Sequence, residues 1–449
     1  IWLEINGIIM GIVDYRLRGG NKMGLNSERI QLSEGIYLNI INEGKFKSNL
    51  LSYYFIRPLT RLDVTKNTLL SMVLKRGSKN YPNSIDLERK LEELYGANLS
   101  LGINKRGEKQ VIRFTVEWAK SIYVGEEYDK DAVDILKELL FNPLIENNGF
   151  IKKYVDQEKE NLKRKIENKI NDKASYAAER CIEVMCKNER YGVYPLGYVE
   201  DLEDINEFNL YEHYKELLKR TPIEIFYVGD VNEKTREYLK NDFKIEREDL
   251  IEIQKDKIID DVQTKNIVVE ELDVNQGKLV MGCRAGIHHN DRLYNPLLVA
   301  SDILGGGPNS KLFKIVREKE SLAYYISSGV YKYKSIMLIQ SGIEFDDFEK
   351  TVDIIRAQLD ELQAGNFTED DISKSIKSIK TNTETIKDSI FLISEFFFSQ
   401  LISRDNRSLD QILEDFDNVK KEEIIEAANK ITIDTIYFMR NKTNKLGVK

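Results

Sequence analysis

Histidine and cysteine are both scarce in this chain, which has three of each among its 449 residues. Three cysteines are too few, and odd in number, for a disulfide framework, so the sequence favours a reducing cytoplasm. The histidines offer little material for a metal site. His213 stands alone on a predicted helix, where a packing role is expected. His288 and His289 are adjacent, and in an extended segment neighbouring side chains point to opposite faces, so a chelating pair is poorly placed. They are expected to lie in a loop after the strand Gln276–Ala285.

Long hydrophobic runs are also absent. No stretch approaches the roughly 20 apolar residues that a membrane-spanning helix needs, so no membrane partner is expected. The formal net charge of −8 argues against nucleic acid or anionic lipid as a partner. With 41% hydrophobic and 32% charged residues, the composition is that of a soluble globular protein, and the length suits two or three domains.

The first 22 residues do not have the basic-then-apolar order of a signal peptide. Residues 18–22 can be back-translated to a purine-rich ribosome-binding sequence just before Met23. We therefore expect Met23 to be the natural start and residues 1–22 to be a non-native leader.

Short motifs occur twice along the chain, in the same order. Pro-Asn-Ser occurs at 82–84 and 308–310, Val-Asp-Ile at 133–135 and 352–354, and Glu-Asp followed by Ile or Phe at 203–205 and 414–416. Because the expected helices and strands around them also match, the sequence predicts an internal duplication.

Each copy is expected to contain two strands, two helices, a strand pair, long helices and a closing strand. In the first copy the strands are Ile36–Ile41, Leu51–Ile56, Asn98–Asn104, Gln110–Glu117 and Ile223–Val228, and the helices are Val64–Lys75, Asp86–Leu94, Lys130–Leu140 and Phe150–Lys169. In the second copy the strands are Lys265–Leu272, Gln276–Ala285, Tyr324–Val330, Ser335–Gly342 and Thr435–Met439, and the helices are Tyr294–Leu304, Leu312–Lys319, Phe348–Gln363 and Glu369–Ser389.

This order predicts an α+β fold with two tandem homologous domains, each a mostly antiparallel sheet covered by helices. The expected domains are residues 23–243 and 265–449, joined by a charged linker over residues 244–264. Phe391–Phe398 is predicted to be a buried helix, and Glu158–Lys173 has the alternating charge of a solvated helix face.

Four anchors occur in one order across the two copies. They are Gly77 after the first helix, Leu91–Ala97 (Leu-Glu-Glu-Leu-Tyr-Gly-Ala), Leu304–Phe313 (Leu-Gly-Gly-Gly-x-x-Ser-x-Leu-Phe) and Arg317-Glu318. In these residues the chain resembles, over about residues 30–445, the pitrilysin/insulinase family of peptidases, which includes the mitochondrial processing peptidases. The resemblance implies that each half of the chain is a peptidase-like domain and that the two form half of a clamshell.

In that family, a His-x-x-Glu-His motif on a helix and a Glu on a later helix form a zinc site, and the motif Glu acts as general base. The corresponding positions here are Asn67, Leu70 and Ser71, with Lys165 at the distal position. Amide, alkyl and hydroxyl groups do not hold zinc tightly, and an ammonium repels it. The resemblance therefore implies a chain with no metal, no other cofactor and no complete catalytic site.

Arg317 and Tyr324 match an Arg-x6-Tyr pair that the resemblance implies binds the substrate backbone across the zinc. A guanidinium and a phenol can donate to peptide carbonyls, and a phenol can also donate to an oxyanion. The corresponding positions of the first copy are Lys90 and Ala97, so the pair is present in the second copy only.

Gly305–Gly307 leaves a helix, and no Gly-Lys-Ser/Thr follows, so a nucleotide-binding loop is excluded. A turn between helices is the favoured interpretation. The alternative is a substrate-contacting segment, such as the one in the non-catalytic subunit of the processing peptidases.

The resemblance implies a non-catalytic subunit of a heteromeric metallopeptidase, in which a homologous subunit with an intact His-x-x-Glu-His motif supplies zinc and acts with this chain on a peptide or unfolded protein. It is similar to the zinc-less bacterial members that accompany an active homologue, some of them associated with aminopentanol modification of elongation factor P. The alternative is an inactive peptidase-like scaffold or binding protein with no share in an active site.

Overall fold

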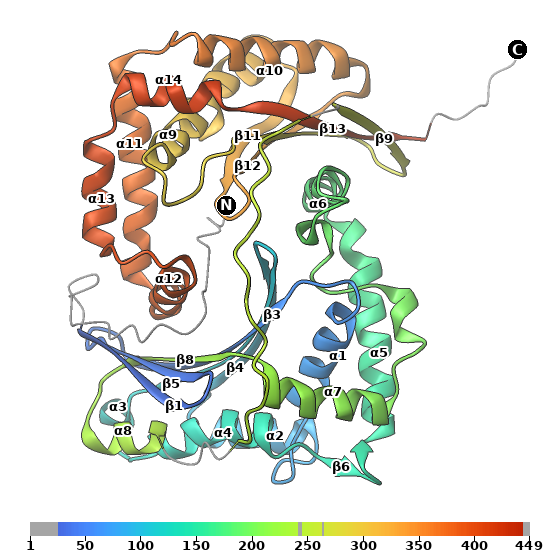
Figure 1. Ribbon diagram of the computed structural model, residues 1–449, viewed down its shortest axis with the longest axis vertical. Coiled ribbons are helices and arrows are strands. Elements are labelled where there is room, and N and C mark those ends of the chain that lie inside the picture. The colour runs from blue at the N-terminus through green and yellow to red at the C-terminus, as the bar shows by residue number, and fades with distance from the viewer. Residues whose placement is uncertain (1–25, 241–244, 263–264, 443–449) are drawn as a thin grey trace, which may run out of the picture.

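The computed structural model describes residues 26–240, 245–262 and 265–442. Two β-sheets, one in each half of the chain, lie in the upper and lower parts of an elongated molecule, with helices at its two ends (Figure 1). The expected leader, residues 1–22, and the expected boundary at residues 243–244 lie outside the described residues. These domain limits stay predictions.

The first sheet has the strand order β1-β2-β8-β3-β5-β4. All neighbouring strands are antiparallel except β2 and β8, which are parallel. The strands are β1 (Asn26–Ser33), β2 (Ile36–Asn42), β3 (Ser48–Pro58), β4 (Asn98–Arg106), β5 (Lys109–Ala119) and β8 (Ile223–Gly229). A separate short hairpin is formed by β6 (Ile145–Glu146) and β7 (Gly149–Phe150).

The second sheet has the order β11-β12-β10-β13-β9, and its one parallel pair is β13 with β9. The strands are β9 (Asn266–Leu272), β10 (Gly277–Arg284), β11 (Ala323–Tyr331), β12 (Ile336–Ile343) and β13 (Thr432–Asn441). Without β1, the first sheet has the same order and the same position of the parallel pair. The predicted α+β fold with two homologous domains is therefore confirmed.

The helices lie close to the predicted positions. In the first half they are α1 (Val64–Lys75), α2 (Ser84–Glu93), α3 (Ser121–Val124), α4 (Asp129–Phe141), α5 (Lys152–Glu167), α6 (Lys173–Met185), α7 (Glu207–Arg220) and α8 (Glu233–Lys240). In the second half they are α9 (Tyr294–Gly305), α10 (Phe348–Gln363), α11 (Glu369–Glu384), α12 (Ile390–Ser403), α13 (Leu409–Asp417) and α14 (Lys421–Asn429).

Three predicted helices differ from the structure. The helix predicted over 369–389 is α11, which ends at Glu384 and is followed by a 3-10 turn over 385–388. The segment predicted as an amphipathic helix over 312–319 is η4 (Phe313–Lys319), a π-helix, in which Glu320 N donates to Ile315 O five residues earlier at 2.9 Å. The helix predicted over 150–169 begins only at Lys152, because residues 149 and 150 form strand β7. The prediction of a solvated face over 158–173 was wrong for Glu158, whose side chain is buried.

Each sheet is covered on one face by helices of its own half and on the other face by a helix of the other half. In β3, Tyr53 and Phe55 face helices of the first half, while Tyr54 and Ile56 face α12 of the second half. Reciprocally, α6 of the first half packs on β10, β12 and β13 (Figure 1). Because strand side chains alternate between faces, neither sheet can bury both faces with its own half alone.

The aromatic side chains of α12 fill the interface between this helix and the first sheet. Phe398 is 1% exposed, and its ring stacks on Tyr54 with centroids 4.0 Å apart and meets Phe226 edge-on at 6.0 Å. The predicted burial of this helix is confirmed at Phe396, Phe397 and Phe398. Cys181 of α6 and Cys186, which follows this helix, lie in the corresponding core on the second sheet.

Buried charges also join the halves. Lys334 of the second half is fully buried and forms ion pairs with Glu108 and Glu189 of the first half, each at 2.7 Å. Arg284 pairs with Glu189 at 2.7 Å and with Asp434 at 2.6 Å. Because every one of these charges has a partner, removing one would leave an uncompensated buried charge.

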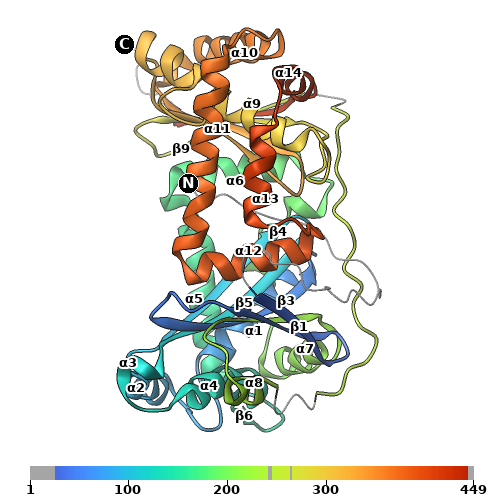
Figure 2. The ribbon, with the colours of Figure 1, turned by 90° about the vertical axis from the view of Figure 1, so that its left-hand side faces the viewer.

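Residues 245–262 form no helix or strand and run along one side of the molecule from the first half to the second (Figure 2). Asp256 fixes this segment, since its carboxylate accepts from Lys109 Nζ at 2.7 Å and from the Glu108 backbone amide at 2.5 Å. Lys334 Nζ donates to the carbonyl of Lys257. The described part of the expected linker is therefore an ordered strap. No helix within residues 26–240, 245–262 and 265–442 has the length and apolar character of a membrane span.

The exchange of helices predicts a large effect of Phe398→Ala on stability. Removing this ring leaves a cavity between α12 and the first sheet, so the free energy of unfolding should fall by about 3–5 kcal/mol. Urea denaturation measures the change. Phe208→Ala is a matched control, because Phe208 is half exposed and its loss should cost about 1 kcal/mol or less. Equal effects of the two substitutions would show that α12 is not part of the core.

Candidate functional site

Helix α1 carries the three positions that correspond to the zinc motif, and all three face the core of the first half. Asn67, Leu70 and Ser71 are 0%, 1% and 2% exposed. They line a residual cavity of about 10 Å³ together with side chains of β3, β5 and α7. This volume is at the lower limit for one water molecule, so the side chains themselves fill the space.

Asn67 is held by two polar partners from neighbouring elements. Its Nδ2 donates to Gln110 Oε1 of β5 at 2.8 Å, and its Oδ1 lies 2.7 Å from His213 Nε2 of α7. Since the amide nitrogen is used by Gln110, Oδ1 accepts, and the Nε2 atom of the imidazole carries the proton. The hydroxyl of Ser71 donates a hydrogen bond to the carbonyl of Thr68 in the same helix at 2.7 Å.

The imidazole of His213 is neutral at pH 7. Its burial, aided by the nearby Arg57, lowers the pKa to about 4. The packing role expected for this histidine is confirmed, but its hydrogen bond to Asn67 was not predicted. The two residues are 146 positions apart, and no sequence pattern links them.

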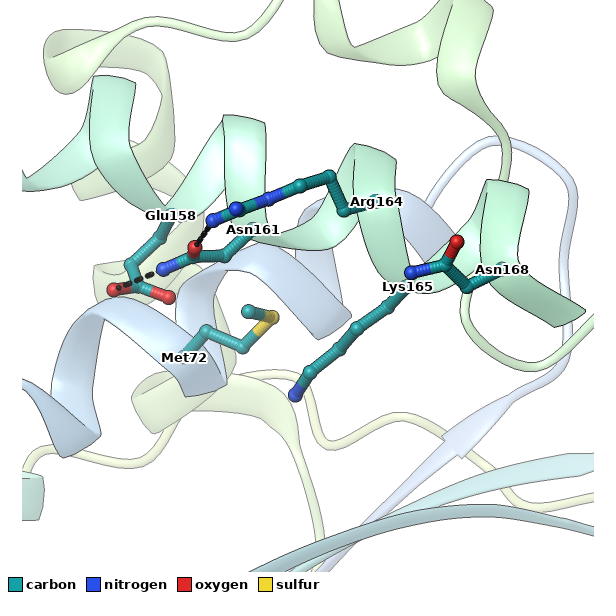
Figure 3. Close-up of a pocket in the computed structure, with 6 residues that line it drawn as sticks. All are labelled: Met72, Glu158, Asn161, Arg164, Lys165 and Asn168. Carbon is teal, nitrogen blue, oxygen red and sulfur yellow. Dashed lines mark hydrogen bonds between the residues drawn. The ribbon is translucent and has the colours of Figure 1, made fainter.

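Lys165 does not lie on the side of α1 that carries Asn67, Leu70 and Ser71. It lines an open groove of about 340 Å³ between α1 and α5, shown in Figure 3. The residues of α1 that face α5 are Met72, which lines this groove, and Arg76, which pairs with Glu158 at 2.8 Å. One residue turns a helix by about 100°, so Ser71 and Met72 point in clearly different directions. The structure therefore brings Asn67, Leu70 and Ser71 together but places Lys165 elsewhere.

The groups at these positions do not fit zinc. An amide that is already hydrogen-bonded, an alkyl chain and a hydroxyl bound to its own helix provide no strong ligand. In the part of the chain that the structure describes, no three His, Cys, Asp or Glu side chains gather into a group that could hold a metal ion.

The adjacent histidines correct one expectation. Their rings do not point to opposite faces, since the centroids of His288 and His289 are 4.0 Å apart. The loop predicted after strand β10 is confirmed, and because the loop is irregular, with a φ of +63° at Gly286, the alternation of an extended segment does not hold in it. Burial lowers the pKa of His289 to about 3, and its Nε2 lies 3.4 Å from the carbonyl of Ser403.

Arg317 and Tyr324 lie in the second half, on η4 and at the start of the edge strand β11, and both side chains are exposed. The Arg317 guanidinium lies over the ring of Phe313, 4.5 Å from its centroid, and has no carboxylate partner among the described residues. The Tyr324 hydroxyl donates to Glu344 Oε1 at 2.6 Å. This hydrogen bond raises the pKa of Tyr324, so the phenol keeps its proton at neutral pH.

Close packing explains why residues 305 and 306 are glycines. A Cβ atom at Gly305 would lie 2.6 Å from the backbone nitrogen of Ser328, and one at Gly306 would lie 2.1 Å from Asp302 Oδ1. The segment connects α9 to η4, so the predicted turn between helices is confirmed.

Zinc analysis tests the loss of the metal site. After dialysis against excess zinc and then buffer, the isolated chain should retain less than about 0.1 zinc per molecule, because no strong ligand set is present. Inductively coupled plasma mass spectrometry measures the content. One tightly bound zinc per chain would overturn this assignment.

A second prediction concerns pH. His213 titrates near 6.5 when unfolded and near 4 when folded, so the stability that its neutral form provides is complete above pH 6.5 and is lost as the pH falls toward 4. The loss should reach about 3 kcal/mol. His213→Gln, which cannot titrate but can still donate to Asn67, should flatten the pH dependence of urea unfolding between pH 7 and 4. An unchanged pH dependence would contradict the buried neutral imidazole.

Comparisons with known proteins agree with this architecture. The family description "Peptidase M16 inactive domain" matches residues 204–379. The protein named "Probable inactive metalloprotease YmfF" from Bacillus subtilis (strain 168) is 36% identical over 409 residues, which are 90% of this chain and 96% of that protein.

Solved structures show the same fold. A conserved protein from Enterococcus faecalis V583 is 28% identical and has a TM-score of 0.85, covering 93% of this chain and 99% of that chain. A peptidase M16 inactive domain from Pseudomonas fluorescens is 16% identical and shares the fold with a TM-score of 0.75, covering 93% of this chain and 99% of that chain. The 36% identity with the Bacillus protein extends over nearly the full length of both chains, and it shows that this chain belongs to the pitrilysin/insulinase (M16) family of peptidases.

Proposed function

We propose that this chain is the non-catalytic, zinc-less subunit of a heteromeric M16 metallopeptidase of the cytoplasm. In this proposal a homologous subunit with an intact His-x-x-Glu-His motif supplies the zinc and the general base. This chain supplies Arg317 and Tyr324, which bind the peptide or unfolded protein substrate. The name of the Bacillus relative, an inactive metalloprotease, is consistent with a chain that has no activity alone.

The contrast between the two halves carries the proposal. The motif positions of α1 are built into the core, where they serve packing and internal hydrogen bonds. Arg317 and Tyr324 are exposed instead, and the fold does not use the Arg317 guanidinium in an ion pair with any described residue. An exposed cation and phenol that the core does not require are available for a ligand.

The local geometry also suits a peptide. β11 is an edge strand, so the backbone groups on its outer side can pair with an extended peptide. Arg317 lies on a π-helix next to this edge, and π-helical turns occur frequently at functional sites. The protonated Tyr324 can turn its hydroxyl from Glu344 to a peptide carbonyl, or to the oxyanion that forms at the zinc of the partner.

Reconstitution with the zinc-bearing homologue tests this role. Tyr324→Phe should lower kcat of the complex by about 10²-fold or more, because loss of one oxyanion donor has that effect in other hydrolases. Steady-state peptide cleavage measures kcat and KM.

Tyr325→Phe is the matched control. Tyr325 is the next residue of the same strand and is only partly exposed, and its hydroxyl forms no hydrogen bond with the described residues. This substitution should leave kcat unchanged within about twofold. Full activity of the Tyr324→Phe complex would reject the shared site and favour the alternative, an inactive scaffold or binding protein.

A further inference from the structure

We infer that the groove between α1 and α5 binds a carboxylate group of a peptide, with Lys165 as the charged donor. This inference rests on the proposed peptide-binding function and adds a second contact in the first half of the molecule, away from Arg317 and Tyr324. The groove has a volume of about 340 Å³ and is lined by Met72, Glu158, Asn161, Arg164, Lys165 and Asn168 (Figure 3).

The charge of the groove is positive because its one carboxylate is already neutralised. Glu158 Oε1 accepts from Arg76 at 2.8 Å and from Asn161 Nδ2 at 3.1 Å. Glu158 is only 7% exposed, so its paired carboxylate presents little surface to a ligand. The charges of Arg164 and Lys165 then remain unbalanced, and they favour an anion.

Lys165 is free to make the contact. Its side chain is exposed and forms no hydrogen bond or ion pair with residues 26–240, 245–262 or 265–442. Figure 3 shows its ammonium extending from α5 toward the space beside Met72, away from the hydrogen-bonded row of Glu158, Asn161 and Arg164. An ammonium in this position can donate a charge-assisted hydrogen bond to a ligand oxygen.

The other walls suit part of a peptide. Met72 provides an apolar, flexible surface for an aliphatic group next to the carboxylate. Asn168 accepts from Asn171 through Oδ1 at 3.4 Å, so its NH₂ group can donate to the ligand. The free Lys165 ammonium, the Asn168 amide donor and the apolar wall of Met72 match a carboxylate attached to a small aliphatic group.

A carboxylate fits better than a phosphate. The groove follows the carboxyl-terminal half of α5, which ends at Glu167, and the partial negative charge at this end of a helix repels a doubly charged phosphate more than a singly charged carboxylate. Phosphate sites use the opposite end of a helix, where free N–H groups converge. The Arg164 guanidinium donates to Asn161 Oδ1 at 2.5 Å, which leaves the Lys165 ammonium as the cation of the groove without a hydrogen bond to a described residue.

Methyl NMR of the full chain with ¹³C-methionine tests the inference, since Met72 is one of seven methionines and its methyl signal can be assigned with Met72→Leu. N-acetyl-leucine should shift this signal in a saturable way with a Kd in the millimolar range, as expected for one charged contact. N-acetyl-leucinamide should bind at least about tenfold more weakly. N-acetyl-glutamate α-amide carries its carboxylate on the side chain, so comparing it with N-acetyl-leucine distinguishes a peptide C-terminus from an acidic side chain.

Two variants assign the binding to Lys165. Lys165→Gln should weaken N-acetyl-leucine at least about tenfold, whereas Lys163→Gln, on the same helix but outside the groove, should have no effect. Equal affinity for acid and amide, an unaffected Lys165→Gln variant, no shift at Met72, or tighter binding of inorganic phosphate would each overturn the inference.

The experiment is independent of the zinc-bearing partner. Binding of the acid to this chain with full activity of the Tyr324→Phe complex would reject only the shared site. Loss of activity in that complex without binding at Lys165 would reject only the carboxylate groove.

Discussion

The exchange of helices between the two halves is the constraint on which the rest of this structure depends. A β-sheet with apolar side chains on both faces needs a cover on each, and each sheet here receives its second cover from the other half of the chain. The ion pairs of Lys334 with Glu108 and Glu189, and the strap fixed by Asp256, lie across the same junction. Together these contacts hold α1 and α5 of the first half in a set position relative to η4 and β11 of the second (Figures 1 and 2).

Within this frame the face of α1 that corresponds to the expected zinc motif is ordinary core. Asn67 exchanges hydrogen bonds with Gln110 and His213, Leu70 packs among apolar side chains, and Ser71 bonds to its own helix. These side chains satisfy one another, so no single substitution restores a zinc ligand set. Arg317 and Tyr324 differ, because they face solvent and contribute little to the core. Packing explains the first group of residues, and our proposal assigns the second group to binding of a peptide substrate.

Much of the fold could be predicted from sequence because its signals are local. The unbroken apolar run Tyr53–Ile56 indicates a strand that is buried on both faces. The predicted limits of α1 match the structure at both ends. The contacts that define the site could not be predicted. Asn67 and His213 are far apart in the chain, and the groove beside Lys165 depends on how α5 packs on α1. A helical motif indicates which residues share a face, but only the packed structure shows which neighbour that face meets. The two histidines after β10 illustrate the same limit, since their loop does not follow the alternation of a strand.

The central claim is that this chain contributes its second half to an active site whose metal belongs to another subunit. Photo-crosslinking tests it most directly. Benzoylphenylalanine placed at position 324 should crosslink to a peptide substrate when the zinc-bearing homologue, inactivated by removal of zinc, is present, and much less when it is absent. Crosslinking that does not depend on the homologue, or none in its presence, would contradict a shared site.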